Sequence, residues 1–497
     1  MNIISPAKVS FFSILVSVFV LVVVGRASGL GAEKRPHVLQ TKPNILVFLT
    51  DDQDFSSMDV LRPDGTYLMR NTKELIKDQG VDFSRFYLAY ALCCPSRATY
   101  LTGQYPHNHG VLDNSGSNGG YQALDHENTL PIWLQGSGYY TGHIGKYMNG
   151  YNGGGGPFNL PTQPPGWNEW YSTLVFSKFF NYELMENGVK VQYGSDEVDY
   201  NTDVLTGKAI TFIETQTTQE KPFFLSVNYI APHVEANGEF PIPAPRHAGM
   251  FSNLPLPTPP SYNESDVSDK PSWVQALPLI TDAEKDVIEE RYQLRLESLA
   301  AVDDGISAII NKLEKLGELN NTVIIFWSDN GLQAGEHRLQ NGKRQIYEES
   351  ARVPLLIRGP GFPKGVVYDD LISNIDLAPT IVDLADAKAL KVMDGRSILD
   401  LIAKGSSEWR KDLLIENPLW EYRALLTKNY IYAEHDYDKD GVVDDKELYN
   451  FVADNCSATP DPYQIESKHA DTCYDQMMQA MSERAERLST CSGRTCK

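Results

Sequence analysis

Short apolar runs recur along the chain and predict buried β-strands. Four of them are rich in β-branched and aromatic residues, and the stretches between them are long enough to form helices. This alternation is typical of an α/β domain in which helices cover both faces of a doubly wound sheet. The four clearest predicted strands cover residues 44–50, 140–145, 223–229 and 323–328.

Polar side chains follow each of these strands. In open α/β sheets, ligands bind at the carboxyl ends of the strands. We therefore expect these side chains to converge on one site, although they lie far apart in the sequence. The residues concerned are Asp51 and Asp52, Lys146, His233 with the preceding Ala231 and Pro232, and Asp329 and Asn330.

Residues 288–316 have the apolar periodicity of a long amphipathic helix. Asp303 and Asp304 lie within it, and we assign this pair to a helix-surface or packing role because no strand end aims it at a ligand. Two long segments rich in glycine, proline or serine, 153–166 and 241–271, predict surface loops of the kind that border active sites.

The pattern changes near residue 394. Short aromatic strands at 422–427 and 430–434 are followed by a helix at 476–488. A chain of 497 residues suits a large catalytic domain with a smaller companion. We predict a catalytic domain over 42–393 and a small C-terminal α+β domain over 394–497.

The amino terminus predicts a secretory signal over residues 1–29. Lys8 precedes an almost unbroken apolar run at 11–24, and small residues follow it. This run is shorter than the ~20 apolar residues that a membrane-spanning helix needs, so we favour cleavage over a retained membrane anchor. The mature protein is then expected in the secretory pathway, either secreted or lysosomal or vacuolar, without a membrane association.

The net charge of −21 excludes nucleic acid as a partner, because phosphate neutralisation needs an extended basic face. An anionic substrate would require a locally basic pocket.

Sequons at Asn263 and Asn320 agree with export and predict a glycoprotein, and a third at Asn455 is weaker if the following cysteine is bridged.

Four of the six cysteines crowd into the last part of the chain, as disulfides in an oxidising compartment would. Four cysteines allow three pairings. We favour Cys491 with Cys496, which closes a small loop and leaves Cys456 for Cys473. Cys93 and Cys94 are adjacent, which disfavours an ordinary disulfide between them, and they need another explanation.

The segment Leu92-Cys93-Cys94-Pro95-Ser96-Arg97 carries that explanation. Pro95 suits the first turn of a helix, which places Cys93 just before a helix whose dipole favours negative charge. Arg97, on the first turn, can face the same point. From these residues alone, a buried structural cysteine pair at a helix start stays an alternative.

Cys93-x-Pro95-Ser96-Arg97, with the following Leu101-Thr102-Gly103, resembles the signature of type I sulfatases, in which the first cysteine is oxidised to formylglycine. The resemblance covers most of the chain and is closest to the N-acetylglucosamine-6-sulfatase group. It implies the fold of the alkaline phosphatase superfamily. Further similar stretches are 105–109, 145–147, 165–167, 317–322, 328–331, 343–345, 353–356 and 491–493.

The resemblance assigns one metal ion to Asp51, Asp52, Asp329 and Asn330, with the modified Cys93 as a further ligand. Oxygen donors suit a hard cation, and we prefer calcium to magnesium because calcium tolerates irregular geometry and bidentate carboxylates. The alternative, in which the two adjacent aspartates only cap a helix, is disfavoured by the accompanying cysteine motif.

In the implied mechanism, one hydroxyl of the hydrated aldehyde attacks sulfur, and the other later expels sulfate. The resemblance places Arg97 beside the nucleophile and Lys146 and Lys343 on the sulfate oxygens. His233 is the expected general acid for the leaving alcohol.

The sequence departs from the arylsulfatase pattern at one position, which concerns the base that assists sulfate release. Many arylsulfatases carry a histidine where this chain has Met148. His107 and His109 are candidates for the base, but we favour a rim or structural role for both. The base is therefore left unassigned.

A second acidic segment, 436–447, matches the EF-hand loop pattern at every ligand position. An EF-hand needs a helix on each side, whereas a strand is predicted before this segment. We therefore prefer an acidic hairpin turn to a second calcium site.

The resemblance implies hydrolysis of sulfate esters, with sulfated sugars such as glucosamine 6-sulfate as substrates. A formylglycine-generating enzyme is the expected maturation partner. The alternatives are hydrolysis of aryl sulfates or of phosphonate and phosphate esters, and a non-catalytic protein that binds calcium or glycans.

Overall fold

The computed structural model describes Met1 and residues 42–152, 162–174, 178–235, 238–419 and 422–497. Apart from Met1, the predicted signal peptide lies outside the described residues, as do 153–161 of the glycine-rich segment. The described residues from 42 to 497 belong to one compact unit, so the domain boundary that we place at 393/394 stays a prediction.

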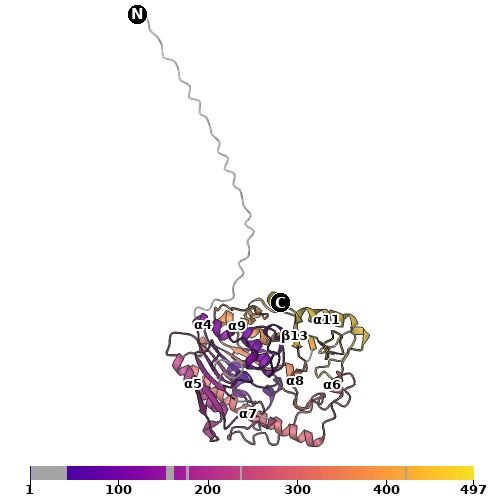
Figure 1. Ribbon diagram of the computed structural model, residues 1–497, viewed down its shortest axis with the longest axis horizontal. Coiled ribbons are helices and arrows are strands. Elements are labelled where there is room, and N and C mark those ends of the chain that lie inside the picture. Colours follow the sequence, from indigo (N-terminus) through magenta and orange to yellow (C-terminus); the bar gives the residue numbers. More distant parts are fainter. Residues whose placement is uncertain (2–41, 153–161, 175–177, 236–237, 420–421) are drawn as a thin grey trace. The chain divides into compact units, whose positions relative to one another are not determined.

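A ten-stranded mixed sheet forms the centre of the molecule (Figure 1). Strands β9, β1, β8, β4 and β5 are parallel neighbours, and β10, β6 and β7 run antiparallel to the strands beside them. In spatial order the strands are β11 (Val366–Tyr368), β2 (Val81–Phe83), β10 (Leu355–Arg358), β9 (Thr322–Ser328), β1 (Asn44–Thr50), β8 (Phe223–Asn228), β4 (Tyr140–Gly145), β5 (Glu169–Thr173), β6 (Glu183–Glu186) and β7 (Val189–Gln192).

The four strands predicted from apolar runs are β1, β4, β8 and β9, and they are consecutive in the middle of this sheet. All seven residues of β1 are buried, because each face of the strand packs against its own layer of helices. Ile45, Val47 and Leu49 face one layer, and Leu46 and Phe48 face the other, as the alternation of a strand requires. The first layer contains α2 (Cys93–Thr102), α4 (Leu130–Gly136) and α9 (Leu377–Leu384), and the second contains α5 (Asn201–Gln216) and α7 (Asp282–Lys315).

Helix α7 starts six residues before the predicted 288–316 segment (Figure 1). Thr281 and Glu284 form a capping box in which each side chain accepts a hydrogen bond from the other residue's backbone N–H. The apolar stripe begins only at Ile288, so periodicity alone misses the capped first turns. Asp303 is buried and accepts hydrogen bonds from Thr72, the last residue of α1 (Arg70–Thr72). Asp304 is partly exposed and pairs with Arg246, so the pair has the predicted helix-surface and packing roles.

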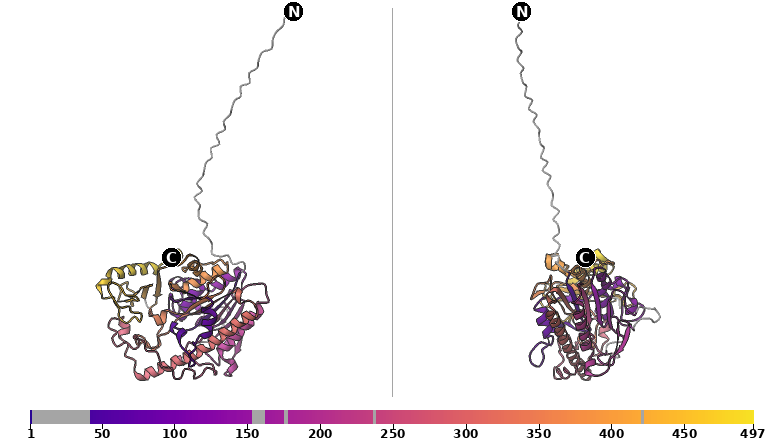
Figure 2. Two further views of the ribbon diagram at one scale, coloured as in Figure 1. Left: turned by 180° about the vertical axis from the view of Figure 1, so that it is seen from behind. Right: turned by 90° about the vertical axis from the view of Figure 1, so that its left-hand side faces the viewer.

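The C-terminal part contains a second, four-stranded antiparallel sheet (Figure 2). Its strands are β13 (Asp412–Asn417), β14 (Tyr422–Thr427), β15 (Tyr430–His435) and β16 (Asp445–Asn450). One face packs on α11 (Asp475–Ser489), with Leu414, Leu425 and Tyr432 against Met478 and Met481. The predicted α+β elements are confirmed, and so are both disulfides, Cys456–Cys473 and Cys491–Cys496.

The acidic segment after residue 435 connects β15 to β16, so strands and not helices flank it. The carboxylates of Asp436, Asp438 and Asp440 lie within 4.8 Å of one another. Glu447, at the last position of the EF-hand pattern, instead bonds to His435, Tyr347 and Tyr449. The structure therefore supports the predicted acidic hairpin turn.

No helix within the described residues is both long and apolar enough to cross a membrane.

The rest of the described chain contains only short elements. Residues 241–271 contain no helix or strand beyond an isolated bridge at Tyr262, as predicted for a loop. The other elements are β3 (Phe86–Tyr87), β12 (Ile372–Ser373), α3 (Pro106–His109), α6 (Ser272–Gln275), α8 (Glu348–Ala351), α10 (Ile398–Lys404), a π-helix at Lys73–Lys77, and 3-10 helices at Phe55–Asp59, Tyr121–Ala123, Glu197–Asp199, Leu319–Asn321, Asn374–Asp376, Ser406–Glu408, Thr472–Tyr474 and Gly493–Cys496.

Candidate active site

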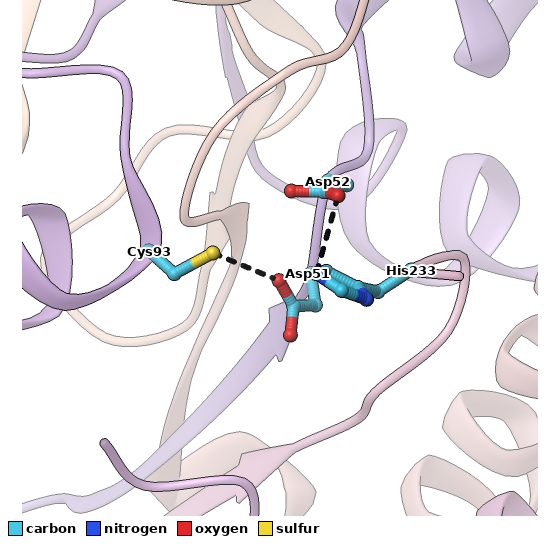
Figure 3. A group of neighbouring side chains, drawn as sticks. All are labelled: Asp51, Asp52, Cys93 and His233. Carbon is cyan, nitrogen blue, oxygen red and sulfur yellow. Dashed lines mark hydrogen bonds and ion pairs between the residues drawn. The ribbon is translucent and has the colours of Figure 1, made fainter. Parts of the chain in front are cut away.

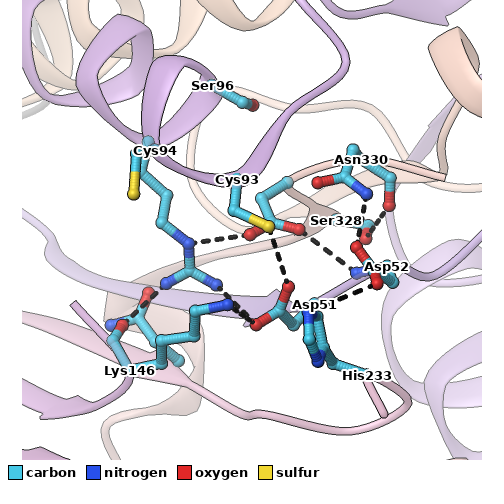
Figure 4. A network of polar contacts seen from close by, with 12 residues as sticks. Asp51, Asp52, Cys93, Cys94, Ser96, Lys146, His233, Ser328 and Asn330 are labelled. Atoms are coloured by element: carbon cyan, nitrogen blue, oxygen red, sulfur yellow. Dashed lines mark hydrogen bonds and ion pairs between the residues drawn. The ribbon is translucent and has the colours of Figure 1, made fainter. Parts of the chain in front are cut away.

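The polar residues that follow the four central strands meet at one edge of the sheet (Figure 3 and Figure 4). Strands β1 and β9 are paired with Thr50 opposite Ser328, which places Asp51 beside Asp329. The backbone N–H of Asp52 donates to Asp329 Oδ1 at 3.2 Å. The convergence expected from the sequence is therefore present in the fold.

Cys93 is the first residue of α2, not the residue before it, because Leu92 is still extended and occupies the cap position. Pro95 accordingly lies at the third helical position. The Cys93 Sγ lies 3.5 Å from Asp51 Oδ1 and 3.4 Å from Lys343 Nζ. Burial raises the pKa of this thiol, although Lys146 and Lys343 oppose the shift. The unmodified side chain is therefore held as a thiol and is a weak nucleophile.

Three cations lie near Cys93, and Figure 4 shows one of them, Lys146. Arg97 Nε donates to Asp329 Oδ2 at 2.7 Å, and its Nη1 donates to the backbone oxygen of Lys146 at 2.7 Å. The Lys146 ammonium pairs with Asp51. Lys343 Nζ lies 2.8 Å from Asp52 Oδ1. Each cation predicted to bind the nucleophile or the sulfate is thus in the site.

The carboxylates differ in their electrostatic environment. Burial alone would raise the pKa of Asp51, but Lys146, His233 and Arg97 outweigh it and hold the pKa well below its ordinary value. Burial would also raise the pKa of Asp52, but Lys343 and His233 outweigh burial and lower this pKa. Burial, together with the charge of Asp51, raises the pKa of Asp329 to about 6. Asp51 and Asp52 therefore stay ionised at a lower pH than Asp329 does.

The site has the donor groups of a cation site. Ligand atoms of Asp51, Asp52, Cys93 and His233 all lie within 4.8 Å of one another (Figure 3). Asn330 Nδ2 donates to Asp52 Oδ1 at 2.5 Å, while its Oδ1 is buried without a hydrogen-bond partner. Rotating this amide by 180° would turn its oxygen toward the carboxylate, which suits a hard cation.

This group differs in membership from the ligand set implied by the sulfatase resemblance. It includes His233, and it does not include Asp329, whose two oxygens are bonded to Arg97 and to the Asp52 backbone. The metal roles assigned to Asp329 and Asn330 stay predictions.

His233 lies beyond β8, after a cis peptide bond between Ala231 and Pro232. Its Nδ1 lies 2.6 Å from the backbone oxygen of Val234, and its Nε2 lies 3.5 Å from Asp52 Oδ2. Burial lowers the pKa of this ring, and the two aspartates oppose the shift. The side chains of His233 and Lys343 are 17% and 20% exposed, more than those of Arg97, Lys146 and the aspartates, so this side of the site faces solvent.

The two histidines considered as bases have structural roles. His109 Nε2 lies 3.0 Å from Thr99 Oγ1, its Nδ1 accepts from the Val111 N–H, and burial lowers its pKa to about 3. His107 bonds to Glu416 and to the backbone oxygen of Cys491. Met148 is buried in the hydrophobic core. The base for sulfate release stays unassigned.

Two residues that the sequence did not flag support the site. Arg295, on α7, donates to the backbone oxygen of Asp52. Ser328 Oγ accepts from the Gln53 N–H and donates to the Asn330 backbone oxygen. The charged Arg295 interrupts the apolar stripe of its helix, a signal that could have identified it.

The fold and its paired cations and carboxylates define a hydrolase that acts on anionic esters. The family model described as Sulfatase matches residues 43–387, and the model described as N-sulphoglucosamine sulphohydrolase, C-terminal, matches residues 335–490. The chain therefore belongs to the sulfatase family.

Similar proteins agree with this assignment. Human N-acetylglucosamine-6-sulfatase is 34% identical over 92% of the chain and 86% of that protein. An extracellular sulfatase homologue from Caenorhabditis elegans is 32% identical over 88% of the chain, which spans 60% of that protein. A homologue from Drosophila melanogaster is 33% identical over 83% of the chain, which spans 37% of that protein. A solved structure described as a complex with its substrate D-glucosamine-2-N,6-O-disulfate is 25% identical, with a TM-score of 0.71 over 90% of this chain and 97% of that chain.

Proposed function

We propose that this protein hydrolyses sulfate esters of sugars, such as glucosamine 6-sulfate, after Cys93 has been converted to formylglycine. The observation that carries the proposal is the position of Cys93, whose buried Sγ lies at a helix start 3.4 Å from one cation and 3.5 Å from an ionised carboxylate. The names of the human relative and of the solved complex support an amino-sugar sulfate as substrate.

The charge balance of the site supports a bound calcium ion. Arg97, Lys146 and Lys343 are offset by three carboxylates, Asp51, Asp52 and Asp329. A site of this composition has little net attraction for a sulfate ester until a dication is added. When bound to Asp51, Asp52, Asp329, Asn330 and the modified Cys93, calcium would draw charge from the sulfate oxygens and stabilise a deprotonated hydroxyl.

The chain's own residues then have distinct tasks. Lys146 and Lys343, which bond to the aspartates here, would be released to bind sulfate oxygens once those carboxylates bind calcium. Arg97 stays fixed by Asp329 and keeps positive charge beside position 93. The hydrated aldehyde would supply one hydroxyl to attack sulfur and a second whose deprotonation expels sulfate.

His233 is the proposed general acid. The bond between Nδ1 and the Val234 oxygen fixes the ring and directs Nε2 into the site. A proton on Nε2 would pass to the leaving alcohol oxygen as its bond to sulfur breaks.

We also propose maturation in the secretory pathway, with a formylglycine-generating enzyme as partner and a secreted, lysosomal or vacuolar destination. The two disulfides support an oxidising compartment, and two relatives are described as extracellular sulfatases.

The test combines mass spectrometry with activity. Protein secreted from a eukaryotic host is digested, and the peptide that contains Cys93 is weighed; the thiol should be replaced by an aldehyde at Cys93 and retained at Cys94. The same protein should release sulfate from N-acetylglucosamine 6-sulfate, while Cys93→Ala should not. An unmodified Cys93 in fully active protein would contradict the proposal, and faster turnover of a phosphonate ester would favour the alternative.

A further inference from the structure

A large cavity lies beside the candidate active site, and nothing in the proposed reaction uses it. Its volume is about 640 Å³, within the range of pockets that hold small ligands. The cavity is lined by Ser272, Trp273, Gln345, Leu419, Tyr422, His435 and Tyr437, and we call it the aromatic pocket.

The aromatic pocket adjoins Lys343 through the chain itself. Gln345 lines the pocket, and its Nε2 lies 3.4 Å from the backbone oxygen of Lys343. Tyr422, another lining residue, donates to the backbone oxygen of Arg344. The segment 343–345 thus has the active-site ammonium at one end and a pocket wall at the other. Lys343 also lies on the solvent-facing side of the site. A bound substrate that extends out of the site past Lys343 would therefore meet this pocket.

The walls of the pocket are tied together by one carboxylate. Asp445 Oδ2 accepts hydrogen bonds from the Ser272 N–H at 2.8 Å, the Ser272 hydroxyl at 2.7 Å and the Tyr437 hydroxyl at 3.0 Å. These contacts join the start of α6 to the β15–β16 hairpin. His435 is fixed by Glu447, which lies 2.9 Å from its Nε2. The pocket is therefore formed before any ligand binds.

The lining has the chemistry of a carbohydrate site. The ring of His435 packs against those of Tyr422 and Tyr437, with centroid distances of 5.7 and 5.5 Å, and Trp273 adds a fourth ring. A pyranose presents an apolar C–H face, which packs on aromatic rings, and a rim of hydroxyls. Gln345, Ser272 and the tyrosine hydroxyls offer polar partners for that rim.

The charge of the pocket differs from that of the catalytic site. Among the described residues that line the pocket there is no lysine or arginine. The turn that carries Tyr437 also carries Asp436, Asp438 and Asp440 with a single ammonium, Lys439, and Asp445 bonds to two lining residues. Negative charge therefore outweighs positive charge here, and a carboxylate or second sulfate would be repelled.

We propose that the aromatic pocket is a subsite for an uncharged pyranose unit that is joined to the sulfated sugar. This inference rests on the proposed sulfatase activity. It implies that the enzyme prefers a sulfated sugar with a neutral neighbour to the same sugar within a chain of uronates or further sulfates.

The test compares substrates that differ only in the neighbouring unit. For the unmodified enzyme, kcat/KM should be highest for a 6-sulfated N-acetylglucosamine linked to a neutral hexose, lower for the monosaccharide sulfate, and lowest for the sulfated sugar linked to a uronate. Trp273→Leu and Tyr437→Leu keep apolar volume but remove one ring each. Each should raise KM for the neutral disaccharide about tenfold, leave its kcat unchanged, and leave turnover of nitrophenyl sulfate unchanged. Tyr67→Leu, at an exposed tyrosine that does not line the pocket, serves as the control.

The outcomes separate the two proposals. If the unmodified enzyme cleaves no sulfate ester, the proposed function fails. If it cleaves nitrophenyl sulfate, but both pocket variants retain the KM of the unmodified enzyme for the neutral disaccharide, the subsite is wrong. A preference for the uronate-linked substrate would also overturn it. Binding of the neutral disaccharide sulfate to Cys93→Ala, measured by calorimetry with and without Trp273→Leu, gives a readout independent of turnover and should show the same tenfold loss.

Discussion

Arg295 reaches from the middle of α7 to the backbone oxygen of Asp52, with Nη2 and the oxygen 2.5 Å apart. Asp52 has a φ of 65°, in the left-handed region that residues other than glycine rarely adopt. Arg295 is only 4% exposed and also lies 3.4 Å from Asp54. The long helix behind the sheet therefore holds the aspartate in its unusual conformation.

Arg295→Met should remove this support while keeping much of the side-chain volume. The variant leaves the Asp52 oxygen without its buried donor and the Asp54 carboxylate without its cation, so the free energy of unfolding should fall by about 3 kcal/mol. Its calcium affinity should fall as well, which calorimetry of the folded protein would measure.

Arg291→Met is the matched control, because Arg291 lies one helical turn away and donates instead to the backbone oxygen of Gln340. If both variants bind calcium equally well, Arg295 does not position Asp52.

Calcium removal should abolish turnover without unfolding the protein. In the metal-free site, Lys146 and Lys343 neutralise Asp51 and Asp52, so the carboxylates are not left unpaired. Chelation should therefore leave the circular dichroism spectrum unchanged, and added calcium should restore activity better than magnesium.

Replacing Asp436, Asp438 and Asp440 together by asparagine tests the other acidic group. This change should affect stability more than turnover, because the three residues lie in the β15–β16 turn and outside the catalytic group. A well-folded triple variant without turnover would show that the turn has a catalytic role.

His233→Ala should affect substrates unequally. With a sugar sulfate, whose leaving group is strongly basic, we expect a loss on the order of 10²-fold or more. With nitrophenyl sulfate the loss should be smaller, because that leaving group departs without a proton. Substitution of Arg97 or Lys343 should impair both substrates alike. An equal loss for His233→Ala would mean that the ring only positions sulfate.

The stability of the protein should increase on mild acidification. Burial raises the pKa of Glu336 from 4.5 to about 7, so the folded state binds a proton that the unfolded state has released. As pH rises from about 4.5 to about 7, the free energy of unfolding should fall, by on the order of 3 kcal/mol from this group. Glu336→Gln should flatten the dependence of the melting temperature on pH, and an unchanged slope would contradict the assignment.

Glycan attachment should differ between the first two sequons. Asn320 is exposed, whereas the Asn263 amide donates to the backbone oxygen of Ile280 and accepts from its N–H. We expect glycopeptide mass spectrometry to find the glycan at Asn320. Asn263→Gln should lower stability without changing the glycan mass, and a full glycan at Asn263 would refute this.

The sequence predicted the central strands and the convergence of their polar ends, because both follow from local periodicity and from the rule that parallel strands share a carboxyl edge. It could not predict that Arg295 contacts Asp52, since 243 residues separate them and only the packing of α7 on the sheet brings them together. Nor could it place the aromatic pocket, whose walls come from α6, the segment after Lys343 and the second sheet. Contacts between distant segments carry no local pattern.

The last residues of the chain bear on the timing of maturation. Asp394 accepts hydrogen bonds from the Tyr105 N–H, just after α2, and from the Gly493 N–H, while His107 bonds to the Cys491 oxygen. Because Cys491 and Gly493 follow the predicted catalytic domain in the sequence, these contacts can form only after that whole domain has been translated. Cys93 is fully buried in the finished fold. The proposed oxidation of Cys93 thus has a natural window during translocation, and slower synthesis of the C-terminal segment would lengthen it.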